Sequence, residues 1–215
     1  MVSSTATKKA VMPTFTGKYA SIRKNFWKDS QRKFEKNDQW VFVKGKSSYY
    51  KTERGYVQAL KRKFNEEMKY LDKIESAGTI TSATISIWFP SRSAQARANV
   101  SYTYIKGGNT HKASVSGGPT GGWGYDKLSA ALADALNKSP EFMKILMDAR
   151  ARRKKLPYGV TLNSGKPFFP HWDGGVGVEC HMDVLKASGY NVEYIRTGIK
   201  DSYTYKVTLK RKRSA

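Results

Sequence analysis

Two stretches of the sequence alternate polar and apolar residues, and turn-forming residues bound both of them. They are residues 84–89 (TISIWF), followed by Pro90, and residues 98–105 (ANVSYTYI), followed by a glycine pair at 107–108. Successive side chains of a β-strand point to opposite faces of the sheet, so a period of two is typical of a half-buried strand. We therefore expect two neighbouring antiparallel strands, with a third over residues 111–116.

Other stretches place apolar residues at helical spacing. The clearest is 53–76, where Gly78 is placed to end the helix, and a second is 125–137. Ser139 precedes Pro140 and Glu141, which predicts an N-cap and the start of another helix. A basic helix over 17–36 and a short helix over 181–187, closed by Gly189, complete the set.

Together these elements predict a mixed α+β fold with an antiparallel sheet and helices packed on one face. The central order is α-β-β-β-α, and alternating residues at 190–196 and 202–210 predict a terminal hairpin. Residues 1–50 are expected to form a basic N-terminal arm with a helix and a short strand at 39–43. Residues 51–215 are expected to form the α+β core domain.

Charge is the strongest indication of a partner. The 215 residues include 39 Lys and Arg against 17 Asp and Glu, a formal net charge of +22. Such an excess opposes compaction by self-repulsion, so a protein that keeps it usually meets a polyanion. We expect DNA or RNA, free or within a host nucleoprotein complex. A surface that is merely very soluble is the alternative.

The candidate nucleic-acid contacts are cations on the polar sides of predicted helices, together with one tryptophan that could stack on bases. They are Arg23, Lys24, Trp27, Lys28, Arg32, Lys33, Lys61, Arg62, Lys63, Lys127, Arg150, Arg152, Arg153, Lys154 and Lys155. Strand aromatics such as Trp88, Phe89, Tyr102 and Tyr104 are expected in the core instead.

Glycines between Gly117 and Gly124 predict an irregular loop that leads into the helix at 125. Backbone amides at such a helix start could hold an anion, with Lys127 adding positive charge. Alternatively, the glycines only permit tight packing and Asp126 caps the helix. The sequence leaves both interpretations open.

No convincing catalytic constellation occurs. The one concentration of histidines and acids comprises His171, Asp173, Glu179, Cys180, His181 and Asp183. These residues could in principle bind a metal in a nuclease, but no zincin motif or paired-carboxylate spacing is present. We therefore expect no enzyme activity, no metal and no cofactor.

The order of one helix, three antiparallel strands, a glycine-containing loop and a second helix resembles that of double-stranded RNA-binding domains. In that family, lysines at the start of the second helix contact phosphates. The resemblance implies such a role for Lys127, which is the one lysine at the corresponding place here.

A more local pattern begins at residues 124–127 (GYDK) and continues through ALN at 135–137, YG at 158–159 and GGVG at 174–177. It resembles a family of uncharacterised small proteins carried by phages and conjugative elements, over roughly the last half of the chain. The resemblance implies a mobile-element setting, in which small proteins often inhibit host defence, for instance as an anti-CRISPR.

The sequence therefore predicts a non-enzymatic protein that binds nucleic acid or a nucleoprotein. The alternatives are a metal-dependent nuclease and a protein-interaction module that docks on an acidic partner. No apolar run approaches the roughly 20 residues that a membrane helix needs, and no secretory signal is evident, so we expect a cytoplasmic protein without a membrane partner. The sequence leaves the oligomeric state open.

Overall fold

The computed structural model describes residues 12–28, 53–90, 95–120, 125–152, 156–157, 168–170, 177–199 and 202–210. A helix over residues 20–28 comes first. The elements after it are α2 (Glu53–Glu75), β1 (Thr79–Trp88), β2 (Ala96–Lys106), β3 (Asn109–Thr120), α3 (Tyr125–Lys138), α4 (Pro140–Ala151), α5 (Glu179–Ala187), β4 (Tyr190–Ile195) and β5 (Ser202–Leu209). Side chains of α2 are described at Arg62 and from Asn65 onward. The strand predicted at 39–43 and the domain boundary predicted after residue 50 lie outside the described residues.

The five strands form one antiparallel sheet in the order β3-β2-β1-β5-β4. The three strands predicted from residues 84–116 pair as consecutive neighbours, and the terminal hairpin β4-β5 joins them through β5 and β1. The predicted mixed α+β fold is therefore confirmed. Local patterning predicts both groups of strands, but the β1-β5 pairing that unites them depends on long-range packing.

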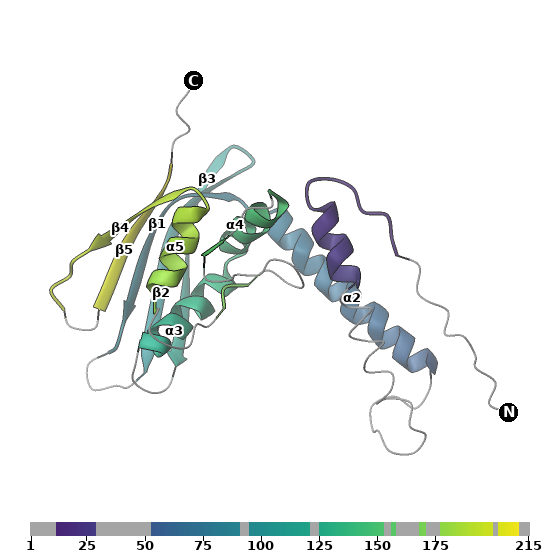
Figure 1. The fold of residues 1–215 in the computed structure, drawn as a ribbon, viewed down its shortest axis with the longest axis horizontal. Helices are drawn as coiled ribbons and strands as arrows, with labels where there is room; N and C mark the ends of the chain where they lie inside the picture. The colour runs from purple at the N-terminus through teal and green to yellow at the C-terminus, as the bar shows by residue number, and fades with distance from the viewer. Residues whose placement is uncertain are drawn as a thin grey trace, which may run out of the picture.

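The helices α3, α4 and α5 lie together on one side of the sheet (Figure 1). α3 packs on β2 and β3, α4 on β1, and α5 on β4. The helix α2 packs against α4 and leads away from the sheet, and the helix at 20–28 lies beside it (Figure 1). The chain thus has a sheet-and-helix layer and a helical projection.

The core lies between the sheet and these helices. Alternate strand residues such as Ile85 and Val100 are fully buried on the helical face, and Leu132 of α3 and Leu146 of α4 are buried in the same core. Tyr19, Ile22 and Phe26 are also buried members of this core. The basic helix predicted for the N-terminal arm therefore packs as part of the core over its described residues.

The strand β3 is longer than predicted, because it continues through Gly117 and Gly118 to Thr120. A Cβ atom at Gly117 would overlap the backbone of Ala131 and Ala135 in α3. Gly118 has a φ of 88°, and its N–H donates to Asp134 Oδ2 at 3.0 Å. These two glycines do not begin an irregular loop. Gly117 lets α3 lie directly on the strand, and Gly118 leaves room for the Ala96 backbone of β2.

Helix ends match the predicted capping at one position and differ at another. Ser139 precedes α4, and its hydroxyl accepts a hydrogen bond from the Phe142 N–H at 3.3 Å, so the predicted N-cap is confirmed. The helix predicted over 53–76 does end before Gly78, at Glu75, but Gly78 lacks the positive φ of a left-handed cap. A Cβ atom there would overlap the ring of Tyr104, so close packing requires the glycine.

Candidate nucleic-acid interface

Arg23 holds the N-terminal helix on α2. Its guanidinium lies 2.7 Å from Asp72 Oδ1 and 2.5 Å from Glu75 Oε2, and its side chain is only 11% exposed. Burial alone would lower the pKa of Arg23, but its hydrogen bonds to Glu75 and Asp72 outweigh burial and raise the pKa. Arg23 was predicted as a phosphate contact; the structure instead places its charge in an internal ion-pair cluster.

Lys24 and Lys28 are exposed on the same helix, four residues apart and so on one face. Trp27 is half-buried beside them. Arg32 and Lys33, the next predicted contacts, lie outside the described residues. Among the described cations of this predicted cluster, Lys24 and Lys28 face solvent and Arg23 is largely buried.

The other predicted cations are spread over three helices. Arg62 of α2 is exposed, whereas the side chains of Lys61 and Lys63 lie outside the described residues. Lys127 in the first turn of α3 is half-buried, and the glycine loop at 121–124, where an anion would bind, is also not described. The interpretation of Lys127 as an anion contact therefore stays a prediction.

The basic end of α4 is described only in part. Arg150 is half-buried, and Arg152 is exposed, with Nε donating to the Asp148 carbonyl at 3.2 Å. Arg153, Lys154 and Lys155 lie outside the described residues. The described predicted cations thus lie on or at the ends of four helices: the helix at 20–28, α2, α3 and α4.

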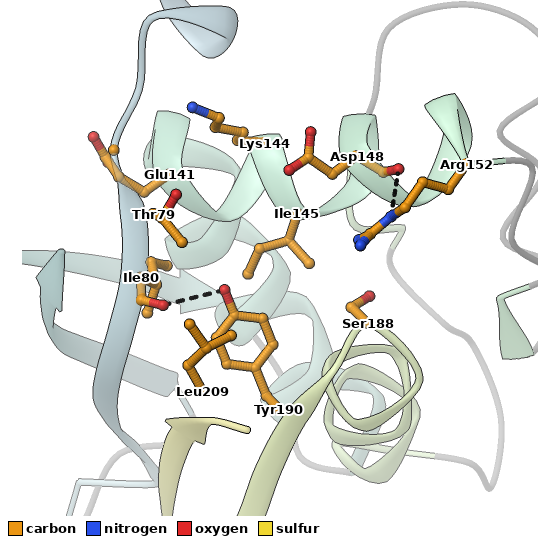
Figure 2. A pocket seen from close by; sticks show the side chains of 11 residues that line it. Thr79, Ile80, Glu141, Lys144, Ile145, Asp148, Arg152, Ser188, Tyr190 and Leu209 are labelled. Atoms are coloured by element: carbon orange, nitrogen blue, oxygen red, sulfur yellow. Dashed lines mark hydrogen bonds between the residues drawn. The ribbon is translucent and has the colours of Figure 1, made fainter. Parts of the chain in front are cut away.

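A pocket of about 150 Å³ lies between α4 and Tyr190, and Lys144, Asp148 and Arg152 are among the residues that line it (Figure 2). Its charged groups have partners within the protein. Lys144 Nζ donates to the Ala77 carbonyl, and Asp148 accepts from the hydroxyl of Tyr19 and from Lys18 at 2.8 Å. These contacts join the helical projection to the core, and they are structural.

Four of the residues considered for a metal site lie on α5, and they have different surroundings. Cys180 and His181 are buried, and His181 stacks on Phe169 with ring centroids 6.0 Å apart. Glu179 is exposed, and Asp183 forms an ion pair with Lys186 at 3.1 Å. His171 and Asp173 lie outside the described residues, and among those described no group of three or more His, Cys, Asp or Glu could hold a metal ion.

Cys180 also has the wrong surroundings for a nucleophile. Burial raises the pKa of its thiol, and the carboxylates of Asp183 and Glu179 raise it further. The reactive thiolate form is therefore disfavoured at neutral pH. The geometry of the described residues provides no support for the nuclease alternative.

The face of the sheet opposite the helices forms a polar surface that the sequence analysis did not identify. We call it the open sheet face. Strand alternation and register assign to it Ser82, Thr84, Ser86, Trp88, Arg97, Asn99, Ser101, Thr103, Ile105, Thr110, Lys112, Ser114, Ser116, Asn191, Glu193, Ile195, Ser202, Thr204, Lys206 and Thr208. Most of these residues carry a hydroxyl. The signal was present in the sequence, because most of the outward-facing strand residues are serine, threonine or asparagine.

The prediction that Trp88 lies in the core is wrong. Trp88 was predicted there with the other strand aromatics, and Tyr102 is indeed buried. Trp88 follows the alternation of Thr84 and Ser86, however, and its register partner is Arg97. It therefore stands at the end of β1 on the open sheet face.

Asn99 organises the hydroxyls over β2 and β3. Its side-chain oxygen accepts from Ser114 at 3.0 Å and from Ser116 at 3.2 Å, and its amide nitrogen donates to Ser101 at 3.4 Å. Ser101 and Ser114 share a further hydrogen bond at 3.3 Å. The register that pairs Ser101 with Ser114 and Asn99 with Ser116 creates this network.

Two lysines flank the middle of the open sheet face. Lys112 on β3 is paired with Thr103 of β2, and Lys206 on β5 is paired with Thr84 of β1. A shallow depression of about 280 Å³ lies between them and is lined by Ser82, Thr84, Ser101 and Thr103 as well. Lys112 and Lys206 are three strand spacings apart across the sheet and are offset by two residues along the strands. Their Cα atoms are therefore roughly 15 Å apart.

No protein-family model, curated protein or solved structure matches the chain. In the part of the chain that the structure describes, no helix is both long enough and apolar enough to cross a membrane.

Proposed function

We propose that the protein binds nucleic acid, free or within a host nucleoprotein complex, and catalyses no reaction on it. The observation that carries the proposal is the charge balance, 39 Lys and Arg against 17 Asp and Glu. Several of the described acids already pair with other cations: Asp72 and Glu75 with Arg23, Asp134 with Lys138, and Asp183 with Lys186. They therefore leave exposed cations such as Lys24 and Lys28 available to phosphates.

The proposed mechanism is neutralisation of phosphates by lysine and arginine, with release of the counterions condensed on the nucleic acid. Such contacts fix the position of a protein on nucleic acid and carry no sequence information themselves. We therefore propose binding with little sequence preference.

Titration of labelled nucleic acid with the protein at a series of salt concentrations tests this function. Four to eight phosphate contacts on a duplex give a slope of log affinity against log salt of roughly −3 to −7. A flat response between low and physiological salt would exclude the proposal. An acidic protein partner captured from cells, and not displaced by nucleic acid, would support the protein-interaction alternative instead.

The GYDK, ALN, YG and GGVG pattern resembles a family of small proteins carried by phages and conjugative elements, and this resemblance supports the biological setting we propose. In this setting a phage or conjugative element encodes the protein, which acts in the cytoplasm of the host cell. Inhibition of host defence, for instance as an anti-CRISPR, is the role we propose there. A pull-down from the host, with and without nuclease treatment, tests whether a defence nucleoprotein is the partner.

A further inference from the structure

We infer that the open sheet face binds double-stranded RNA, by contacting its phosphates and its 2′-hydroxyl groups. This inference rests on the proposed function and deepens it, because it assigns a surface and a class of nucleic acid. The predicted helical cations, such as Lys24 and Lys28, do not lie on this face.

The charge of the open sheet face suits a polyanion. Its cations are Arg97, Lys112 and Lys206, and its single acid is Glu193. Arg97, Lys112 and Lys206 are all exposed, so their charges are accessible. Glu193 stands on the edge strand β4, paired with Lys206, and therefore reduces the attraction at one side only.

The shortage of aromatic side chains on this face favours a duplex over a single strand. Proteins that bind single strands without sequence preference stack the bases on aromatic residues. Trp88 is the one aromatic residue of the open sheet face, and it is the last residue of β1. The centre, between Lys112 and Lys206, offers hydroxyls and ammonium groups that can bind phosphates and sugar hydroxyls, and no aromatic ring on which a base could stack.

The short reach of the central side chains favours RNA over DNA. Serine and threonine on a sheet contact only groups that stand at the surface of a partner. An RNA duplex has a wide, shallow minor groove that displays 2′-hydroxyls, whereas the B-DNA minor groove is about 6 Å wide and 7.5 Å deep. Hydroxyls such as those of Thr84 and Thr103 both donate and accept, so they match 2′-hydroxyls as well as phosphates.

The Asn99 network gives this surface a fixed arrangement before any partner binds. Ser114 and Ser116 both donate to the Asn99 side chain, so the orientations of these hydroxyls are set within the protein. A preordered surface loses less side-chain freedom on binding. Each hydroxyl retains acceptor capacity for an RNA 2′-hydroxyl.

The test compares binding of the full chain to an RNA duplex and a DNA duplex of the same length and sequence. We expect tighter binding to RNA. The variant Lys112→Gln/Lys206→Gln should weaken RNA binding roughly tenfold and reduce the magnitude of the salt slope by about 2, since each lost phosphate contact removes about 1. Glu193→Gln should tighten binding.

Two further variants separate charge from hydroxyl recognition. Lys138→Gln/Lys186→Gln removes the same formal charge from exposed lysines of α3 and α5, which lie on the other side of the sheet, and should bind RNA as wild type does. Thr84→Val/Thr103→Val keeps shape and charge, and should weaken RNA binding several-fold without changing DNA binding. Thermal melting of every variant reports whether its fold is intact.

Equal or tighter binding to DNA, or unchanged RNA affinity of folded Lys112→Gln/Lys206→Gln, would overturn this inference while leaving the proposed function intact. Failure of the wild-type protein to bind any nucleic acid would overturn both.

Discussion

The Arg23 guanidinium and the Asp72 carboxylate, 2.7 Å apart, join the N-terminal helix to α2. Because Glu75 binds the same guanidinium, Arg23→Ala removes the shared partner of two acids and leaves them repelling each other. We expect the unfolding free energy to fall by about 1–2 kcal/mol. The loss of a fully buried ion pair would cost more, but both acids are exposed to solvent. Denaturant unfolding measures it. Exposed Lys24→Ala is the matched control and should change stability by less than about 0.5 kcal/mol.

Gly117 is expected to tolerate no side chain. A methyl group there overlaps the backbone of Ala131 and Ala135, and neither helix nor strand can move without disturbing the core. Gly117→Ala should cost about 2–3 kcal/mol or prevent folding. Gly107→Ala is the control, because Gly107 has a φ of 58° with open space around it, so only backbone strain of roughly 1 kcal/mol applies. Equal costs in thermal or denaturant unfolding would contradict the packing role of Gly117.

Three buried tyrosines make the unfolding free energy depend on pH in the alkaline range. Burial raises the pKa of Tyr102, Tyr190 and Tyr205 to about 12 in the folded chain, against about 10 when unfolded. A raised folded pKa favours the protonated folded state, so this stabilisation is fully present below pH 10 and is lost as pH rises toward 12. Unfolding free energy should therefore fall across that interval.

Tyr190→Phe provides the check on this pH dependence. The Tyr190 hydroxyl donates to the Ile80 carbonyl at 3.3 Å, and its removal deletes one titrating group without opening a cavity. The variant should show a shallower alkaline decline in denaturant unfolding. A decline as steep as that of the wild type would show that Tyr190 does not contribute.

Much of the fold was predictable because local sequence determines local structure. The alternation at 84–89 and 98–105 predicted strands that occur as parts of β1 and β2, and Ser139 predicted the start of α4. The β1-β5 pairing was not predictable, because periodicity identifies a strand without identifying its neighbour. Gly117 likewise looked like a loop residue, since the helix that demands it packs from elsewhere in the chain.

The candidate site was less predictable for the same reason. Arg23 looked like a phosphate contact on a basic helix, yet its partners Asp72 and Glu75 lie about fifty residues away in the sequence. Lys112 and Lys206 lie 94 residues apart in the sequence, and the strand pairing and its register bring them to one face. Their common surface becomes visible only when register is known.

The N-cap of α4 supports one more prediction, because Ser139 also contacts the sheet. Its fully buried hydroxyl accepts from the Phe142 N–H and lies 3.0 Å from the Tyr102 hydroxyl, which in turn donates to Glu141 at 2.9 Å. Ser139→Ala removes the cap and one member of this buried network, and should cost about 1–2 kcal/mol.

Ser188→Ala is the matched control for this substitution. Ser188 is also a buried serine, but its hydroxyl donates at 2.7 Å to the Val184 carbonyl, one helical turn earlier in α5. Serine back-bonding of this kind contributes little to helix stability, so Ser188→Ala should cost clearly less than Ser139→Ala. Denaturant unfolding of the two variants compares them directly. Equal costs would mean that the hydroxyl of Ser139 acts only as a buried polar atom, and that the cap and the link to Tyr102 add nothing.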